Sequence, residues 1–128
     1  MRKTLVVDDS VMMRRLMRSA LKQINITDVA EAENGRMALD ILMKGAADFE
    51  LIVCDWTMPD MTGIELLKAC KIDESMRRIP FVMVTAEAQR ASMLEAIYSG
   101  VDDYVVKPFT PNKLQEAIQK AKDRIDRS

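Results

Sequence analysis

Polar residues with complementary chemistry stand at the ends of four short apolar runs in this sequence. Asp8 and Asp9 end the first run, Asp55 the second, Thr85 the third and Lys107 the fourth. Carboxylates that met in one pocket would repel each other, since two such charges about 4 Å apart cost about 4 kcal/mol at an effective dielectric constant of about 20. Hard oxygen ligands favour Mg²⁺ as the balancing cation. With an ammonium and a hydroxyl group added, the set can stabilise a phosphoryl group during its transfer to a carboxylate.

The run that precedes Asp55 covers residues 51–54 and shows no apolar/polar alternation. Such a run is typical of a strand buried on both faces. Pro59 and Gly63 indicate that a loop follows it. Asp55 alone would be equally consistent with the start of a turn, so the other runs must decide between a turn residue and a reactive group.

The whole chain alternates between strand and helix patterns. We expect strands at 4–8, 29–32, 51–54, 81–84 and 104–106, and helices within 10–24, 37–45, 62–73, 88–99 and 110–125. Five such alternations predict an α/β fold with a parallel sheet and helices on both faces. The carboxyl ends of all strands then lie at one edge, where open sheets bind their ligands. The polar strand ends therefore converge, which favours a site over a merely solvated charge cluster.

Cap residues support several helix starts. Ser10, the capping-box pair Thr62 and Glu65, and Thr110 followed by Pro111 are typical of the first turn. Asn34-Gly35 is interpreted as a turn, after which Met37 is expected on a buried helix face. The first helix should bury Met13, Leu16, Met17, Ala20, Leu21 and Ile24 and expose Arg14, Arg15, Arg18 and Lys22.

Composition narrows the function classes. The 128 residues predict one domain, residues 1–128, without an output domain. A net charge of −1 gives no electrostatic case for nucleic acid, and we find neither a membrane-spanning run nor a signal peptide. Cys54 and Cys70 are expected as buried free thiols in a reducing cytoplasm, with a disulfide or metal pair as the lesser alternative. The chain has no histidine, so it cannot supply its own phosphohistidine.

Four segments together carry a resemblance to a known family. Residues 6–10 (VVDDS), 55–63 (DWTMPDMTG), 84–87 (VTAE) and 104–110 (YVVKPFT) resemble the receiver domain of two-component response regulators, in order and spacing, over essentially the whole chain. Within that family the stand-alone chemotaxis regulators are the most similar. The resemblance implies the flavodoxin-like strand order 2-1-3-4-5.

The resemblance also implies a role for each pocket residue. Asp55 would be the phosphoacceptor, and Asp8, Asp9 and Asp55 would hold Mg²⁺ together with the backbone carbonyl of Thr57. Lys107 would pair with the phosphoryl group, and its bond to the following proline is usually cis in this family. The protein would thus be a phosphoacceptor switch, with Mg²⁺-dependent self-phosphorylation from phosphodonors and autodephosphorylation, rather than an enzyme acting on a separate substrate.

The switch and the partner surface are expected at helix 88–99, the last strand and helix 110–125. Thr85 would bond a phosphoryl oxygen, and Tyr104 would turn inward when Thr85 moves. Arg90, Met93 and Leu94 would lie beside Tyr104 on the partner surface, with Met93 and Leu94 partly exposed. Thr57 and Glu87 each stand two residues past a pocket residue, at the rim where water enters, and are expected to tune dephosphorylation.

The leading hypothesis is a monomeric receiver that takes a phosphoryl group from a histidine kinase and signals by binding another protein. A chemotaxis kinase and a flagellar motor switch protein are the first choice of partners. Thr57, Gln89-Arg90 and Ala117 depart from the best-known chemotaxis pattern, which leaves the hydrolysis rate, a phosphatase and the output partner open.

Three alternatives remain beside it. The first is a phosphorelay shuttle. The second is a phosphatase of the haloacid dehalogenase type, which needs a second aspartate where Thr57 stands. The third is a flavodoxin-like nucleotide binder, against which the glycine-free, acidic first turn argues.

Overall fold

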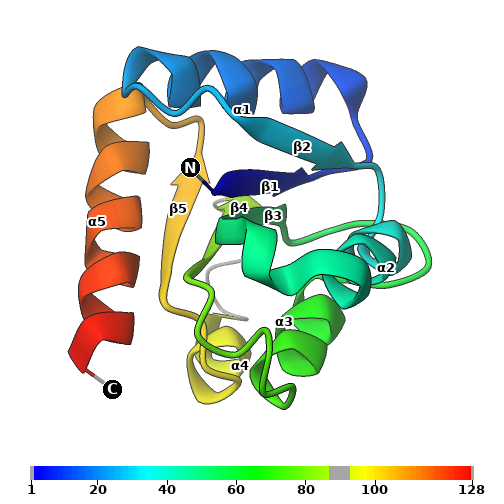
Figure 1. Ribbon diagram of the computed structural model, residues 1–128. Helices are drawn as coiled ribbons and strands as arrows, with labels where there is room; N and C mark the ends of the chain where they lie inside the picture. The colour runs from blue at the N-terminus through cyan, green and yellow to red at the C-terminus, as the bar shows by residue number, and fades with distance from the viewer. Residues whose placement is uncertain (1, 87–92, 128) are drawn as a thin grey trace.

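Strands and helices alternate throughout residues 2–86 and 93–127, the part of the chain that the computed structural model describes (Figure 1). In chain order the elements are β1 (Lys3–Val7), α1 (Val11–Gln23), β2 (Val29–Ala32), α2 (Gly35–Gly45), a 3₁₀ turn (Ala46–Asp48), β3 (Phe49–Asp55), α3 (Gly63–Lys71), β4 (Phe81–Ala86), α4 (Met93–Tyr98), β5 (Asp103–Lys107) and α5 (Pro111–Arg127). Within these described ranges, no helix is both long and apolar enough to cross a membrane.

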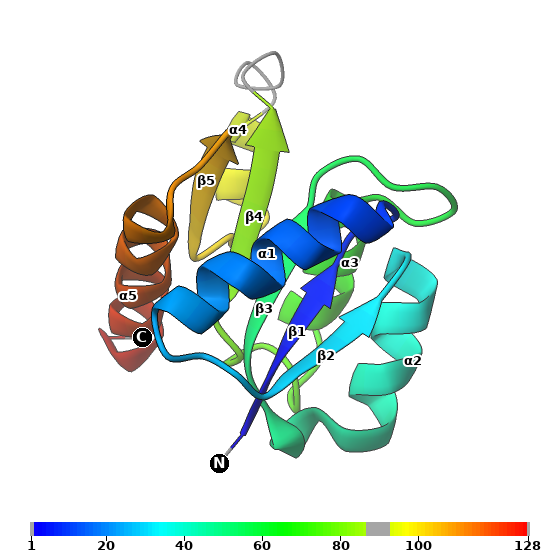
Figure 2. The same cartoon turned by 90° about the horizontal axis from the view of Figure 1, so that it is seen from above.

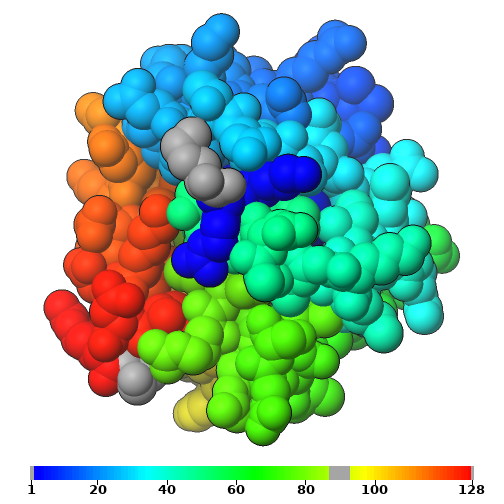
Figure 3. Space-filling view, in the orientation of Figure 1, coloured from blue at the N-terminus to red at the C-terminus, as the bar shows by residue number. Residues whose placement is uncertain are grey.

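The strands form one parallel sheet in the order β2-β1-β3-β4-β5, which confirms the predicted topology. Figure 2 shows the arrowheads of the strands pointing the same way, so their carboxyl ends share one edge. Helices α1 and α5 cover one face of the sheet, and α2, α3 and α4 cover the other (Figures 1 and 2). In the space-filling view α1 lies along the top and α5 along the left side, and helix side chains hide most of the sheet (Figure 3).

Strand β3 runs through the middle of both apolar cores. Leu51 and Val53 enter the core beneath α1 and α5, while Ile52 and Cys54 enter the core beneath α2, α3 and α4. All four side chains are 0% exposed. An unbroken apolar run is therefore required, because each face of this strand is covered by helices.

Side-chain caps begin most helices where the sequence indicated. Ser10 Oγ accepts the Met13 N–H at 3.1 Å at the start of α1, and Thr110 Oγ1 accepts the Lys113 N–H at 3.2 Å at the start of α5. Thr62 and Glu65 form the reciprocal capping box of α3. Asn34 corrects the turn interpretation: its Oδ1 accepts the Met37 N–H at 2.8 Å, so it caps α2 directly. Each such cap contributes about 1 kcal/mol to helix stability.

Four helix predictions were wrong in detail. Leu16 and Met37, expected in the core, are 55% and 44% exposed. Arg14, expected in solvent, has a side chain only 12% exposed. Helix α3 ends at Lys71 instead of near residue 73. Residues 87–92, where the fourth helix was expected to begin, lie outside the described part of the chain.

A buried ion pair fixes the corner between α4 and β5, at the edge of the sheet away from the acidic strand ends. Asp102 Oδ2 accepts from Lys71 Nζ of α3 and from the Phe81 N–H of β4, both at 2.8 Å. Asp102 is 7% exposed. Gly100, with φ of +95°, ends α4 just before this pair, in a conformation that a side chain would strain. The pair therefore ties α3, β4 and the start of β5 together.

Replacing Asp102 by alanine should lower the free energy of unfolding by about 3 kcal/mol, because a half-buried ammonium and a buried N–H lose their acceptor. Urea unfolding followed by circular dichroism measures the change. The control Asp40→Ala removes an exposed carboxylate from α2 and should change stability by less than about 0.5 kcal/mol. Equal effects of the two substitutions would contradict the anchoring role of Asp102.

Candidate functional site

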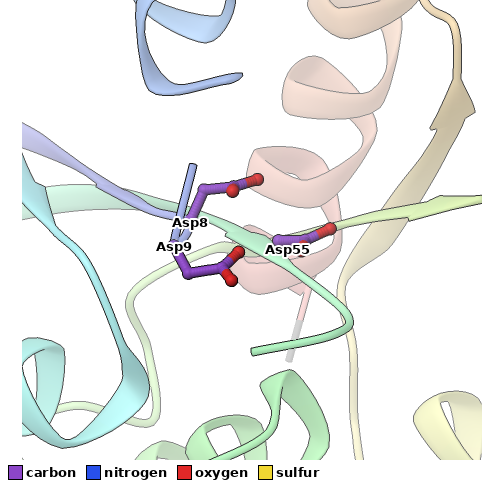
Figure 4. A group of neighbouring side chains, drawn as sticks. All are labelled: Asp8, Asp9 and Asp55. Atoms are coloured by element: carbon purple, nitrogen blue, oxygen red, sulfur yellow. The ribbon is translucent and has the colours of Figure 1, made fainter. Parts of the chain in front are cut away.

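The predicted carboxylates meet at the carboxyl edge of the sheet. Asp8 and Asp9 follow β1, and Asp55 is the last residue of β3, which is the neighbour of β1 in the sheet (Figure 4). One carboxylate oxygen from each of the three lies within 4.8 Å of the others. Asp8 and Asp55 are buried, at 2% and 6% exposure, and Asp9 is exposed. The edge thus places two buried acids beneath one that faces solvent.

Lys107 supplies a positive charge to the same pocket. Its Nζ lies 2.8 Å from Asp55 Oδ1, and it is the last residue of β5, ahead of a cis peptide bond to Pro108. When all four groups are ionised, two negative charges remain uncompensated among these side chains. The pocket is therefore built to receive further positive charge beside Asp55.

Asp55 is held by the backbone around it. The Trp56 N–H donates to the Val84 carbonyl at 2.9 Å, and the Gly63 N–H donates to the Trp56 carbonyl at 3.0 Å. At Gly63 a Cβ would collide with the Asp55 carbonyl oxygen and approach Met83 Sδ to 2.9 Å. The first residue of α3 thus packs directly against the acid-bearing turn, and only glycine fits there.

Asp8 is fixed by three hydrogen bonds that leave one oxygen unused. Its N–H donates to the Ala32 carbonyl at 3.1 Å, its Oδ1 accepts the Ser10 N–H at 2.9 Å, and its carbonyl accepts from Arg14 Nη1 at 2.7 Å. Its Oδ2 is buried and has no hydrogen-bond partner among the described residues. Burial raises the pKa of this carboxyl to about 6, helped by the charges of Asp55 and Asp9 and opposed by the Ser10 N–H and Lys107.

These features fit a metal ion. The donors are hard carboxylate oxygens, the pocket carries excess negative charge, and a buried oxygen lacks a partner that a cation would provide. Mg²⁺ is a hard cation that prefers oxygen ligands of this kind. Asp8, Asp9 and Asp55 could hold such an ion.

Thr85 lies one residue past the point where β4 pairs with Asp55. In the sheet register Asp55 pairs with Val84, Thr85 pairs with Val106, and Ala86 pairs with Lys107. Thr85 is 0% exposed, and its Oγ1 donates to the Ala86 carbonyl at 3.2 Å. Its hydroxyl therefore belongs to the strand between the two that carry Asp55 and Lys107. Thr57 is exposed in the loop after β3.

The expected partner surface is only partly exposed. Leu94 is 62% exposed and Tyr104 is 36% exposed, but Met93, expected to be partly exposed, is 5% exposed and packs in the core beneath α4. Glu87 and Arg90 lie outside the described residues. Ile97 and Tyr98, which the sequence reasoning missed, are 46% and 86% exposed. Their spacing from Leu94, three and four positions, was the signal that could have shown a second apolar stripe.

Arg14 and Glu31 were also missed as neighbours of the site. Arg14 bonds the Asp8 carbonyl, and its Nε donates to Glu31 Oε1 at 2.9 Å. In the sequence Arg14 is indistinguishable from the adjacent Arg15, because both follow the polar pattern of the helix. Only the packing of α1 across β1 and β2 separates them.

The comparisons with known proteins agree with this geometry. A family model described as the response regulator receiver domain matches residues 4–119. The chemotaxis protein CheY of Pseudomonas aeruginosa is 46% identical over 124 residues, which cover 97% of this chain and 98% of that protein. CheY-3 of Vibrio cholerae is 43% identical and covers 96% of this chain and 93% of its own. The solved structure of the chemotaxis response regulator CheY4 of Vibrio cholerae has a TM-score of 0.83 at 33% identity, covering 94% of this chain and 98% of that one.

The raised pKa of Asp8 predicts a pH-dependent instability of the metal-free protein. The folded state binds this proton more tightly than the unfolded chain, so the stability from protonation is complete below about pH 4 and is lost as the pH rises through about 6. Asp8→Asn, which stays neutral, should therefore raise the free energy of unfolding at pH 8 by on the order of 2 kcal/mol.

The measurement is urea unfolding in EDTA at pH 4 and pH 8. The gain from Asp8→Asn should vanish at pH 4, where the native carboxyl is protonated as well. Asp40→Asn removes an exposed carboxylate from α2 and should show no such difference between the two pH values. A gain from Asp8→Asn that is equal at both values would refute the assigned titration.

Proposed function

This chain belongs to the response regulator receiver domain family, and on that basis we propose that it is a phosphorylation-dependent switch in chemotaxis. A CheA-like histidine kinase would phosphorylate Asp55, and the phosphorylated form would bind an output protein, the flagellar motor switch protein. The observation that carries the proposal is the placement of Asp55 beside Lys107 and the acidic pair at one sheet edge. The names of the relatives support chemotaxis as the process.

The reaction is a phosphoryl transfer between proteins. A carboxylate oxygen of Asp55 attacks the phosphorus of a phosphohistidine on the kinase, forming an O–P bond as the N–P bond breaks. The electron pair of that bond returns to the imidazole, which takes up a proton. Lys107 stabilises the charge on the phosphoryl oxygens, and Thr85 offers a hydroxyl donor from the strand between. When bound by Asp8, Asp9, Asp55 and the Thr57 carbonyl, Mg²⁺ supplies further charge neutralisation.

Signal output would use the surface formed by α4, β5 and α5. Leu94, Ile97, Tyr98 and Tyr104 are exposed apolar or aromatic side chains there. The sequence adds Arg90 to this proposed surface, although it lies outside the described residues. A groove of about 560 Å³ lies between β5 and α5 and is lined by Tyr104 and Lys107, among others. One strand therefore carries both the pocket lysine and the surface tyrosine, which gives phosphorylation a short physical route to the partner surface.

In this proposal the protein acts as a monomer in the cytoplasm. Its buried free thiols, Cys54 and Cys70, suit a reducing compartment. The signal would end by hydrolysis of the phosphoryl group, at a rate tuned by Thr57 and Glu87 at the rim, or by the action of a phosphatase. A phosphorelay shuttle would share the same chemistry and differ only in passing the phosphoryl group to a further protein.

Incubation with a small acyl-phosphate donor and Mg²⁺ should add one phosphoryl group to the protein, at Asp55. Asp55→Asn should abolish the addition, because the amide cannot form the acyl phosphate, and EDTA should abolish it in the native protein. Intact-mass spectrometry with peptide mapping measures both results. Asp60→Asn alters an exposed acid in the same loop and should leave uptake intact. Uptake by Asp55→Asn at the native rate would overturn the assignment.

Phosphorylation should tighten binding to a motor switch peptide of the same organism by 5- to 150-fold, on the order of 1–3 kcal/mol, because a ligand shifts a two-state equilibrium only by its differential affinity. Beryllofluoride serves as the phosphoryl mimic, and fluorescence anisotropy measures the affinity. Tyr104→Ala should remove most of the gain while Asp55 still accepts phosphate.

The matched control for this experiment is Leu16→Ala, which removes an exposed apolar side chain from α1 instead of β5. It should leave the affinity and its gain unchanged. If Leu16→Ala abolishes peptide binding and Tyr104→Ala does not, the output surface lies at α1. If no peptide binds but the phosphoryl group passes on to another protein, the shuttle is the correct function.

A further inference from the structure

Among the pocket residues, Asp8 is held by hydrogen bonds to nearly all of its polar atoms. Its backbone N–H and carbonyl and its Oδ1 each make a hydrogen bond, to Ala32, Arg14 and Ser10 respectively. The remaining Oδ2 is buried without a hydrogen-bond partner in the described ranges. The residue is thus held in place from three sides, and a single oxygen is left to meet a cation.

The strongest of these restraints comes from Arg14. Its Nη1 lies 2.7 Å from the Asp8 carbonyl oxygen, and its side chain is 12% exposed. The same guanidinium is also held by Glu31 of β2, because its Nε donates to Glu31 Oε1 at 2.9 Å. Glu31 Oε2 in turn lies 3.1 Å from Arg18 Nη1, whose other contact is the Val29 carbonyl at 3.3 Å. The network links the edge strand β2, helix α1 and the turn that carries both acids.

We propose that Arg14, oriented by Glu31, is a positioning residue for the cation site: it fixes the Asp8–Asp9 turn so that the two carboxylates are placed before the ion arrives. The inference rests on the proposed Mg²⁺ site and extends it to two residues that touch neither the ion nor the phosphoryl group. Partners that orient metal ligands in this way typically change metal affinity by about 10- to 100-fold when removed.

The direction in which Mg²⁺ affinity changes when Arg14 is removed distinguishes a positioning role from a purely electrostatic one. Arg14 carries a positive charge close to a cation site, so its charge alone repels Mg²⁺, and its removal should tighten binding. Loss of a restraint on Asp8 should instead weaken binding, because the turn must then be ordered when the ion binds. The two explanations therefore predict opposite results for the same substitution.

The test compares Arg14→Met with Arg15→Met, which removes the same charge from the next, exposed position of α1. Mg²⁺ alone is titrated and followed by the fluorescence of Trp56, the only tryptophan, which adjoins Asp55. We expect about tenfold weaker binding for Arg14→Met, and unchanged or slightly tighter binding for Arg15→Met. Arg14→Lys keeps the charge but cannot bond both the carbonyl and Glu31 through a fork, so it should also bind more weakly.

A second pair of variants tests the role of Glu31. Glu31→Gln and Glu33→Gln each remove one negative charge from β2 or the residues just after it, but only the first removes the ionic partner of Arg14, because the amide oxygen that remains is a weaker acceptor for its Nε–H. Glu31→Gln should weaken Mg²⁺ binding more than Glu33→Gln does. In the background of Arg14→Met, Glu31→Gln should have little further effect, because the two residues act as one unit.

The stabilisation of each variant by Mg²⁺ gives a readout that does not depend on Trp56. Unfolding in urea with and without the ion reports affinity through the gain in stability, and the ion-free curves show whether a variant is folded. Native affinity in a folded Arg14→Met overturns the positioning role while leaving the Mg²⁺ site intact. Absence of any Mg²⁺ effect on the native protein overturns the proposed site itself, and the positioning role with it.

Discussion

The structure depends on keeping like charges together at one edge of a parallel sheet. Asp8, Asp9 and Asp55 bring carboxylate oxygens within 4.8 Å of each other, and two of these acids are almost fully buried. Lys107 balances only part of this charge. Such a cluster would drive a flexible loop apart, but here the strands that carry it are fixed by apolar cores on both faces. The core therefore supplies the free energy that holds the acids in place.

The sequence was sufficient for the parts of the fold that local rules determine. The apolar run of β3 and the capping box at Thr62 each have one natural interpretation, and the structure confirms both. The burial predictions failed for residues at the boundary between the apolar and the polar face of a helix. Leu16 and Met37 follow the apolar period yet lie at the margins of their stripes, where they stay 55% and 44% exposed. Burial at such margins is decided by the neighbouring elements, which periodicity does not describe.

The candidate site also contains residues that the sequence predicts and contacts that it does not. The acids and Lys107 were predictable because strand ends converge in any parallel sheet. The contact of Arg14 with the Asp8 carbonyl was not predictable, because it depends on how α1 crosses β1 and β2. Met93 shows the opposite error: it was expected to be partly exposed on the partner surface, but as the first residue of α4 it packs into the core between that helix and the sheet.

The electrostatic strain of the pocket is what would make it a switch in the proposed function. A ligand can shift a conformational equilibrium only if it interacts differently with the two states. Because burial raises the pKa of Asp8 to about 6, the metal-free pocket has lost the stability from protonation at neutral pH, where the ligands would bind. In the proposed function, a cation and a phosphoryl group would change the charge beside Asp55 and would thereby act on Lys107, which pairs with it, and on Thr85 of the neighbouring strand. Lys107 and Tyr104 share β5, and the Lys71–Asp102 pair holds the residue just before that strand, so in the proposed function a change at Lys107 would reach Tyr104 along a strand whose start is fixed. The proposed switch would therefore act by turning the Tyr104 side chain, because the backbone at the start of β5 is held in place.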